Sequence, residues 1–430
     1  MPPFGPVFSK ARRSLAAPLA LAAAALLLSP QARAVPSFAR QTGFSCDMCH
    51  TQFPELTPFG RAFKASGYTM STEKSISGKD SGRSTLELVG LPPLSAMLQT
   101  TYVHTQGTQV DGNGHPLRND NIALPEQLSF FLAGKIAPNL GAFIQVTYSA
   151  LDNSFGIDNT DIRYSQSANV GGSPLVWGLT LNNNPTLTDL WHDTPAFGIP
   201  FAGSEMAPGP SASPLISSLG QNTVGMGAYA LWNNLVYAEV EGYRTSPAGM
   251  LPVVQTPSTA TDVINGWAPY WRVALTRDFG PHSVEVGTYG MTGAVLAGDA
   301  GTLVAPASDF TDLALDAQYQ YILGDNIFTA DGSFIHENQS TRGTETSHLN
   351  STTVSASYLF RRQIGVRATY LDAGGTADQT SHVVMADLNL VPWLNTQLIL
   401  RYTANLEIDG ATGSAASDKN SLLALAWIAF

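Results

Sequence analysis

The sequence predicts an all-β protein, a transmembrane antiparallel β-barrel of about sixteen strands that follows a small N-terminal segment. Only 13% of the 430 residues are charged, about half the share of a soluble domain, and the mean hydropathy is +0.01. A polytopic helical membrane protein would carry repeated apolar runs of about 20 residues, and only one short run is present, at the start. Most of the remaining chain shows period-2 alternation of apolar and polar residues, which is typical of strands.

The charge balance is acidic, with 22 Lys and Arg against 33 Asp and Glu and a net charge of −11. Four of the basic residues lie within 1–34, so the rest of the chain is more negative still. Nucleic-acid binding requires a basic footprint, and no nucleic-acid partner is therefore expected. A cationic partner or substrate fits this charge better.

Residues 1–34 have the pattern of a secretory signal peptide. A basic n-region is followed by an apolar run at 15–28 and by the small residues of Ala32-Arg33-Ala34. Cleavage is expected after Ala34, which would leave a mature protein that works outside the cytoplasm.

The only two cysteines lie in Cys46-Asp47-Met48-Cys49-His50, the C-x-x-C-H signature of covalent c-type haem attachment. The two thiols would bond to the porphyrin vinyl groups, and His50 would be the proximal ligand of the iron. A structural zinc site would need four ligands, and a thioredoxin-like pair would need a βαβ setting that the flanking sequence lacks. A disulfide between the two would close too small a loop to stabilise much. One covalently attached haem c is therefore expected.

Residues 35–85 are expected to form a monohaem cytochrome c-like segment, with a helix that starts at Thr57-Pro58 and ends at Gly67. So short a segment has almost no core without its cofactor. The side chains expected to cover the porphyrin are Phe53, Phe59 and Phe63, and Arg61 or Lys64 is expected to meet a propionate. Packing of these side chains on the barrel also fits the sequence. Met70 is the best candidate for the distal ligand of the iron, while an open or Lys-ligated position also fits the sequence.

Residues 86–430 are expected to form the barrel. Leu313, Leu315 and Tyr319 alternate with Asp312 and Asp316, which predicts apolar side chains outward and polar side chains inward. The candidate strands are 91–102, 128–136, 140–150, 160–167, 175–181, 223–231, 235–243, 270–278, 282–291, 310–321, 326–337, 349–360, 363–372, 381–391, 394–406 and 420–430. Short links alternate with longer ones, as in outer-membrane barrels with short periplasmic turns and long outer loops.

The longest link, 182–222, either folds into the lumen or is a surface loop, and both readings fit its sequence. The chain ends on Phe430 after alternating apolar residues, which resembles the recognition signal of bacterial outer-membrane barrels. The barrel assembly machinery and outer-membrane lipid are therefore expected partners. The scattered histidines show no metal spacing and are expected to be ordinary loop or rim residues: His104, His115, His192, His282, His336, His348 and His382.

The N-terminal motif resembles that of the monohaem outer-membrane cytochrome–porin fusions, which include the iron oxidases. Ala34 to Gly43 (AVPSFARQTG), followed by Cys46–His50, matches the family pattern A-x-P-x-F-A-R-Q-T-G-x-x-C-x-x-C-H at every fixed position. Phe53 to Arg61 continues the resemblance, which over the barrel is architectural. It implies oxidation of extracellular Fe(II), transfer of the electron to periplasmic carriers, and haem attachment at Cys46, Cys49 and His50.

A sixteen-stranded barrel can enclose an aqueous lumen, and its apolar band is about 25 Å tall. One haem in the periplasm cannot span that band, so residues 35–80 are expected to fold into the lumen. Asp152, Asp158 and Asp161 are expected near the outer rim, where carboxylates would attract Fe(II). Two alternative functions are a conduit for a non-iron donor or acceptor, and a diffusion porin with a structural haem. The expected location is the bacterial outer membrane, with the haem segment periplasmic or within the lumen.

Overall fold

The computed structural model describes residues 36–80, 83–90, 92–108, 119–149, 153–245, 262–297, 304–341, 346–376 and 380–430. The predicted signal peptide at 1–34, Asp152 and His115 lie outside these described residues. Within the same ranges, every helix is too short or too polar to cross a membrane.

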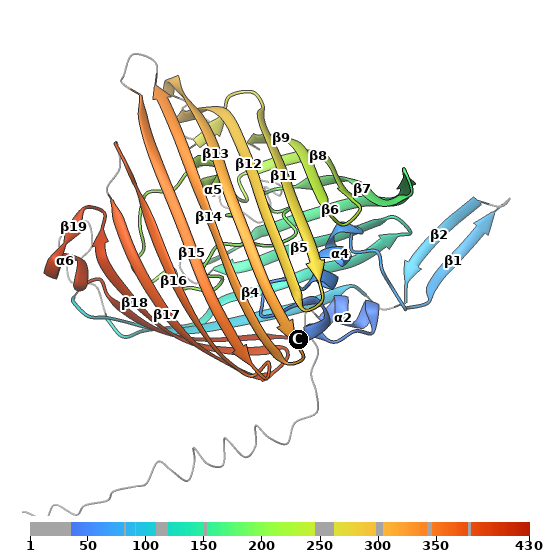
Figure 1. Ribbon diagram of the computed structural model, residues 1–430, viewed down its shortest axis with the longest axis horizontal. Coiled ribbons are helices and arrows are strands. Elements are labelled where there is room, and N and C mark those ends of the chain that lie inside the picture. The colour runs from blue at the N-terminus through green and yellow to red at the C-terminus, as the bar shows by residue number, and fades with distance from the viewer. Residues whose placement is uncertain are drawn as a thin grey trace, which may run out of the picture. The chain divides into compact units, whose positions relative to one another are not determined.

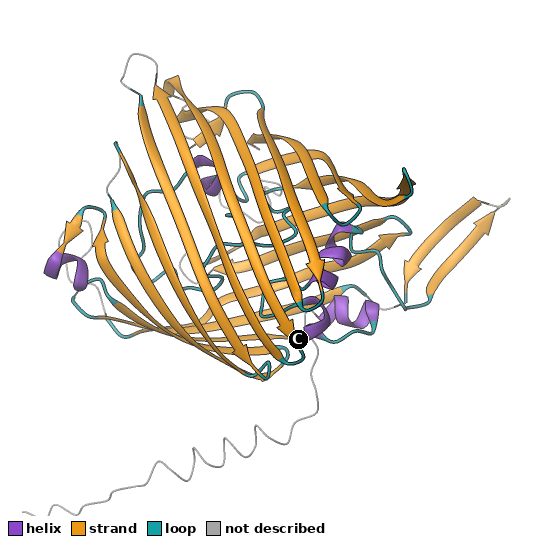
Figure 2. Cartoon of the chain, viewed as in Figure 1, coloured by secondary structure: helices purple, strands orange, loops and turns teal. Residues whose placement is uncertain are grey.

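The long strands close into an antiparallel barrel (Figures 1 and 2). They follow sequence order from β3 (Leu94–Thr105) to β9 (Val236–Thr245) and from β11 (Ala268–Phe279) to β20 (Ser421–Ala429). Pairing of β9 with β11 and of β20 with β3 closes the ring. The other long strands are β4 (Asn121–Ala137), β5 (Leu140–Ser149), β6 (Ser154–Val170), β7 (Ser173–Asn182), β8 (Thr223–Trp232), β12 (His282–Ala297), β13 (Val304–Leu323), β14 (Asn326–Thr341), β15 (Ser347–Phe360), β16 (Ile364–Gly375), β17 (Ser381–Trp393) and β18 (Thr396–Ile408), with short additions at β10 (Asp262–Ile264) and β19 (Ala411–Thr412).

All sixteen predicted strands are present in the described part of the chain, but several extend farther at the long-loop end than predicted. β4 begins at Asn121 instead of 128, β6 at Ser154 instead of 160, and β13 at Val304 instead of 310. In β4 the alternation in fact continues, with Ile122 and Leu124 73% and 72% exposed, but Pro125 follows them and interrupts the strand pattern. Reading strands from the sequence pattern alone therefore underestimates their length.

The faces of the strands are sorted as the alternation predicts. In β13, Leu313 and Leu315 are 54% and 59% exposed on the outside, whereas Asp312 and Asp316 are buried inside. In β16, Val366 points outward and Arg367 is buried. An apolar outer surface around a polar interior is typical of a membrane-spanning barrel.

The N-terminal segment occupies the end of the barrel where the short turns lie, next to the C-terminus in Figure 1. Its helices are α2 (Pro36–Thr42), α3 (Cys46–Cys49) and α4 (Pro58–Ala65). Ser37 Oγ lies 3.2 Å from Ser95 Oγ of β3, and Gln41 Oε1 accepts a hydrogen bond from the backbone N–H of Lys135 in β4. The helices thus pack against the inward faces of the wall strands.

A hairpin that the sequence did not predict follows these helices. β1 (Ser75–Asp80) pairs with β2 (Arg83–Val89) in a separate two-stranded sheet and has no partner strand in the barrel. The hairpin extends away from the barrel in Figure 1, so the lumenal position expected for 35–80 does not apply to β1. The expected boundary between residues 85 and 86 falls inside β2.

The long link 182–222 folds into the lumen, which confirms the inward reading. Leu187, Leu190 and Trp191 are each only 1% exposed. The link includes the short helix α5 (Leu215–Ser218), whose first backbone N–H groups donate to wall carboxylates. This inserted link and the N-terminal helices together fill much of the lumen, whereas α6 (Gly413–Ser417) lies in an exposed outer loop.

Candidate haem site

The local fold of the N-terminal segment places its two cysteines beside helix α4. Thr57 caps that helix by accepting a hydrogen bond from the N–H of Gly60 at 3.1 Å, and Pro58 occupies its first turn, as predicted. Gly67 follows the helix with φ of 67°, the left-handed conformation expected of a C′ glycine. A Cβ on Gly60 would lie 2.1 Å from the carbonyl oxygen of Cys49, so only glycine permits α3 and α4 to approach this closely.

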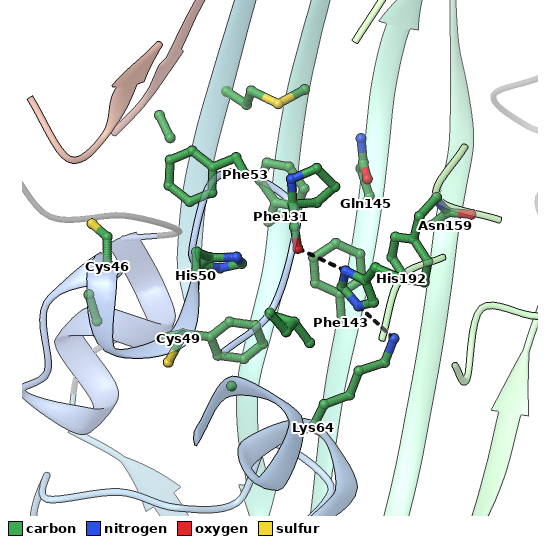
Figure 3. A pocket seen from close by; sticks show the side chains of 18 of the residues that line it. Cys46, Cys49, His50, Phe53, Lys64, Phe131, Phe143, Gln145, Asn159 and His192 are labelled. Carbon is green, nitrogen blue, oxygen red and sulfur yellow. Dashed lines mark hydrogen bonds between the residues drawn. The ribbon is translucent and has the colours of Figure 1, made fainter. Parts of the chain in front are cut away.

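Cys46, Cys49 and His50 line one cavity of about 420 Å³ (Figure 3). His50 Nδ1 lies 3.2 Å from the carbonyl oxygen of Glu55, which fixes the imidazole and leaves Nε2 as the nitrogen for an iron. Burial lowers the pKa of His50 to about 4, so the imidazole is neutral at physiological pH, as a metal ligand must be. Burial, with a contribution from Asp47, raises the pKa of Cys49 to about 11.

The rest of the cavity wall is mainly apolar and aromatic. The wall aromatics are Phe38, Phe44, Phe53, Phe63, Tyr68, Phe131, Phe143, Phe197, Phe201 and Trp427. They come from the N-terminal segment, from β4, β5 and β20, and from the inserted link. A flat apolar ring system bound through two thioethers and one imidazole matches this combination of residues. The residues present therefore fit a covalently attached haem c.

The side chains predicted to contact the haem divide into two groups. Phe53, Phe63 and Lys64 line the cavity. The other predicted contacts, Phe59, Arg61 and Met70, are not among the lining residues. Phe59 packs edge-to-face on Phe44 with ring centroids 5.3 Å apart. The backbone carbonyl of Met70 accepts a hydrogen bond from Gln41 Nε2 at 2.7 Å.

Arg61 ties the N-terminal segment to the barrel wall. Its guanidinium donates to Gln318 Oε1 at 3.2 Å and to Gln320 Oε1 at 3.0 Å, both on β13. The side chain is only 5% exposed. The structure thus gives Arg61 wall partners on one face of α4, while Lys64 on the same helix reaches the cavity.

His192 is the site residue that sequence reasoning missed. The sequence predicted an ordinary loop or rim residue, which is wrong, because His192 lines the cavity and is 6% exposed. Its Nδ1 lies 2.8 Å from the carbonyl oxygen of Pro54, and its Nε2 lies 3.0 Å from Lys64 Nζ. Burial and the neighbouring Arg163 lower the pKa of Lys64 to about 7. No metal spacing could have revealed this histidine, which reaches the cavity through the fold of the inserted link.

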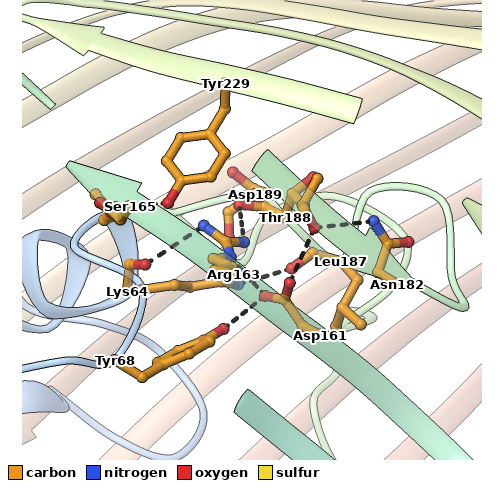
Figure 4. Close-up of polar contacts among 12 residues, drawn as sticks. Lys64, Tyr68, Asp161, Arg163, Ser165, Asn182, Leu187, Thr188, Asp189 and Tyr229 are labelled. Atoms are coloured by element: carbon orange, nitrogen blue, oxygen red, sulfur yellow. Dashed lines mark hydrogen bonds and ion pairs between the residues drawn. The ribbon is translucent and has the colours of Figure 1, made fainter. Parts of the chain in front are cut away.

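A buried polar network joins the segment, the wall and the inserted link (Figure 4). Tyr68 Oη donates to Asp161 Oδ2 at 2.7 Å, and Arg163 Nε donates to the same oxygen at 2.6 Å. Arg163 Nη2 also donates to the carbonyl of Thr188 in the link at 3.0 Å. Lys64 Nζ adds a bond to the carbonyl of Asp189 at 2.6 Å. All three parts of the lumen are therefore held by shared partners.

The expected outer-rim acids lie inside the lumen. Asp161 is fully buried against Arg163, and Asp158 lines the haem cavity. The placement at the rim is therefore wrong for both. The reason is the early start of β6 at Ser154, which puts both residues within the strand instead of at its loop end.

The barrel wall holds the loop that orients His50. The Glu55 carboxylate pairs with Arg367 of β16 and accepts from Thr51 Oγ1 at 2.8 Å, while the Glu55 carbonyl contacts His50 Nδ1. Glu55 and Arg367 are 1% and 5% exposed, so this ion pair is shielded from solvent. Arg367 is therefore a positioning residue for the expected iron ligand.

We expect Arg367→Gln to raise the midpoint potential of the haem by about 30–60 mV, since 59 mV corresponds to a tenfold change for one electron. A looser Glu55 loop weakens the hydrogen bond to His50 Nδ1, which makes the imidazole a poorer donor and stabilises Fe(III) less. Potentiometric titration followed by visible absorbance measures the shift. Arg401→Gln is the matched control, because Arg401 pairs with Asp387 of β17. An unchanged potential with the haem still covalently bound would contradict the role of Arg367.

No protein-family model and no curated protein matches the chain. Solved outer-membrane barrels do match 78% of it. The anion-selective porin from Comamonas acidovorans is 14% identical, with 98% of that chain covered and a TM-score of 0.48. The outer membrane channel DcaP of Acinetobacter baumannii is 11% identical, with 96% covered and a TM-score of 0.47. A loop-deletion form of OmpT, an outer membrane protein of Vibrio cholerae, is 12% identical, with 98% covered and a TM-score of 0.46. At these identities the likeness concerns the barrel fold alone.

Proposed function

We propose that this protein is an outer-membrane c-type cytochrome–porin that takes electrons from extracellular Fe(II) and delivers them to periplasmic carriers. The observation that supports it most is the convergence of Cys46, Cys49 and His50 on one apolar cavity, with His50 Nδ1 held by the Glu55 carbonyl. Iron as the donor comes from the resemblance of residues 34–61 to the cytochrome–porin fusions. One-electron Fe(III)/Fe(II) chemistry is what a haem supplies when it is bound here.

Different residues of the chain would attach the haem, ligate its iron and exclude water from the cavity. Cys46 and Cys49 would hold the porphyrin, and His50 would ligate its iron from one side. The wall aromatics would exclude water, which raises the strength of electrostatic interactions in the cavity. The net reaction would convert Fe(II) to Fe(III) outside the cell and reduce a one-electron acceptor in the periplasm.

The proposal is tested on purified protein in two steps. A reduced-minus-oxidised visible spectrum should show the α-band of a c-type haem, and its absence would remove the haem from the proposal. When the oxidised protein is then rapidly mixed with Fe(II), the haem should become reduced, as seen by the appearance of the α-band. If the haem stays oxidised at both neutral and acid pH while another donor reduces it, the protein is a conduit for a non-iron donor.

The diffusion-porin alternative is less favoured by the contents of the lumen. The N-terminal helices and the inserted link lie where an open porin would hold water, and their contacts with the wall are buried. Electron transfer requires no movement of the N-terminal helices or of the inserted link.

A further inference from the structure

The two ends of the barrel carry opposite charge among the side chains that the structure describes. At the short-turn end, the exposed or half-buried basic residues are Arg40, Lys74, Lys135, Arg277, Arg361 and Arg362, against the acidic Asp47, Glu73, Asp278 and Asp325. At the long-loop end, the acidic residues include Asp120, Glu205, Asp309, Glu407, Asp409 and Asp418, against the basic Arg244 and Lys419. A net acidic chain thus presents a basic face at the end where the haem cavity lies.

Apolar side chains are also exposed on this basic face. Phe44 and Met48 are 38% and 42% exposed, and each lies two residues from Cys46 in the sequence. Phe44 also lines the cavity, whereas Met48 does not. Both belong to the N-terminal segment, so they are not part of the lipid-facing surface of the strands. Exposed apolar groups beside a redox centre and surrounded by charge are typical of a surface that another protein covers.

The basic residues reach the immediate surroundings of the cysteines. Arg362 Nη1 donates to the carbonyl of Asp47 at 3.4 Å, and its side chain shares a small cleft with Cys46. Arg361 is next to it in the β15–β16 turn, and its guanidinium stands 5.2 Å from the ring centroid of Phe360. Arg40 donates to the carbonyl of Leu94 at the start of β3. Arg362 Nε also lies 3.6 Å from Asp325 Oδ1 and 4.0 Å from Asp47 Oδ2, so these two carboxylates offset part of the charge, and Arg40 and Arg361 carry the rest of the basic character near the cysteines.

We propose that this face, with Phe44 and Met48 at its centre and Arg40, Arg361 and Arg362 around them, is the docking surface for a soluble redox protein. The partner would carry acidic side chains around its own electron-accepting centre. Complementary charge steers such partners together and fixes their orientation, while a small apolar centre keeps the complex short-lived. This inference rests on the proposed electron-transfer function, because without a haem the face would have no redox partner.

The test uses the full-length haem protein in nanodiscs of zwitterionic phosphatidylcholine. The reduced protein is mixed by stopped flow with plant plastocyanin, an acidic copper protein, or with horse cytochrome c, a basic one. We expect the bimolecular rate constant with plastocyanin to fall roughly tenfold between low and high ionic strength. At low ionic strength, the rate constant with cytochrome c should be smaller than that with plastocyanin. The double change Arg361→Gln with Arg362→Gln should lower the plastocyanin rate at low salt and leave the rates at high salt equal.

The matched controls are Arg244→Gln and Lys419→Gln, which remove charge from the opposite end of the barrel. They should leave the plastocyanin rate unchanged. An equal loss in these controls, or a rate independent of salt, would overturn the docking surface. If the arginine variants keep the rate but lose binding to vesicles that contain phosphatidylglycerol, the arginines serve lipid headgroups and the proposal is wrong. Protein without a haem spectrum would instead refute the proposed function, and this would be seen before any mixing.

Discussion

Replacing both cysteines, as Cys46→Ala with Cys49→Ala, is expected to abolish covalent haem while leaving a folded barrel. Thioethers to Cys46 and Cys49 would be the covalent link to the haem, since His50 alone would hold it by one coordinate bond. The barrel should survive, because its strands pair in a closed ring that does not include α3. Haem staining after denaturing electrophoresis measures the link, and heat-modifiable migration measures the barrel.

Met48→Leu is the matched control for the double cysteine change. Met48 lies between the cysteines, is largely exposed, and is not among the residues that line the cavity. The haem stain and the visible spectrum should therefore be unchanged in this variant. Covalent haem that persists after loss of both cysteines would contradict the assignment of the C-x-x-C-H motif.

The barrel can be predicted from the sequence because every strand that crosses lipid places apolar side chains outward and polar side chains inward. Leu313 and Leu315 face outward and Asp312 and Asp316 face inward, so period-2 alternation marks the strand and its orientation together. The start of β4 at Asn121 was not predicted because Pro125 interrupts the strand pattern, although Ile122 and Leu124 still face outward. The β1–β2 hairpin lies outside the barrel sheet and carries no such signal.

In the candidate haem site, local sequence motifs predict some of the residues, and only the tertiary fold brings in the others. Cys46, Cys49, His50 and the Thr57 cap lie close together in the chain, and a motif or a capping rule identifies them. His192 reaches the cavity from a link that starts more than 130 residues after His50, through the fold of that link and its bond to Pro54. Phe59 and Phe63 were both expected to cover the porphyrin, but of the two only Phe63 lines the cavity.

Replacing residues 184–221 with a short Gly-Ser linker is expected to turn a closed barrel into a conducting one. The intact protein should show little conductance in planar bilayers, because Leu187, Leu190 and Trp191 are buried in the lumen. The variant should conduct roughly tenfold more, since a sixteen-stranded barrel without an inserted link leaves an aqueous channel. The β7–β8 hairpin can close over the linker, because Asn182 already pairs with Gly225.

Replacing the inserted link is also expected to lower the stability of the barrel. Removing the link frees the wall carboxylates Asp312 and Glu337 from the N–H groups of α5, but water that enters the lumen can hydrate them. The free energy of unfolding should therefore fall less than it would if a buried charge stayed dry. Deletion of 413–417, the exposed helix α6, is the matched control and should leave the conductance low. An intact protein that already conducts like an open porin would favour the diffusion-porin function, because ions would then pass the inserted link in which Leu187, Leu190 and Trp191 are buried.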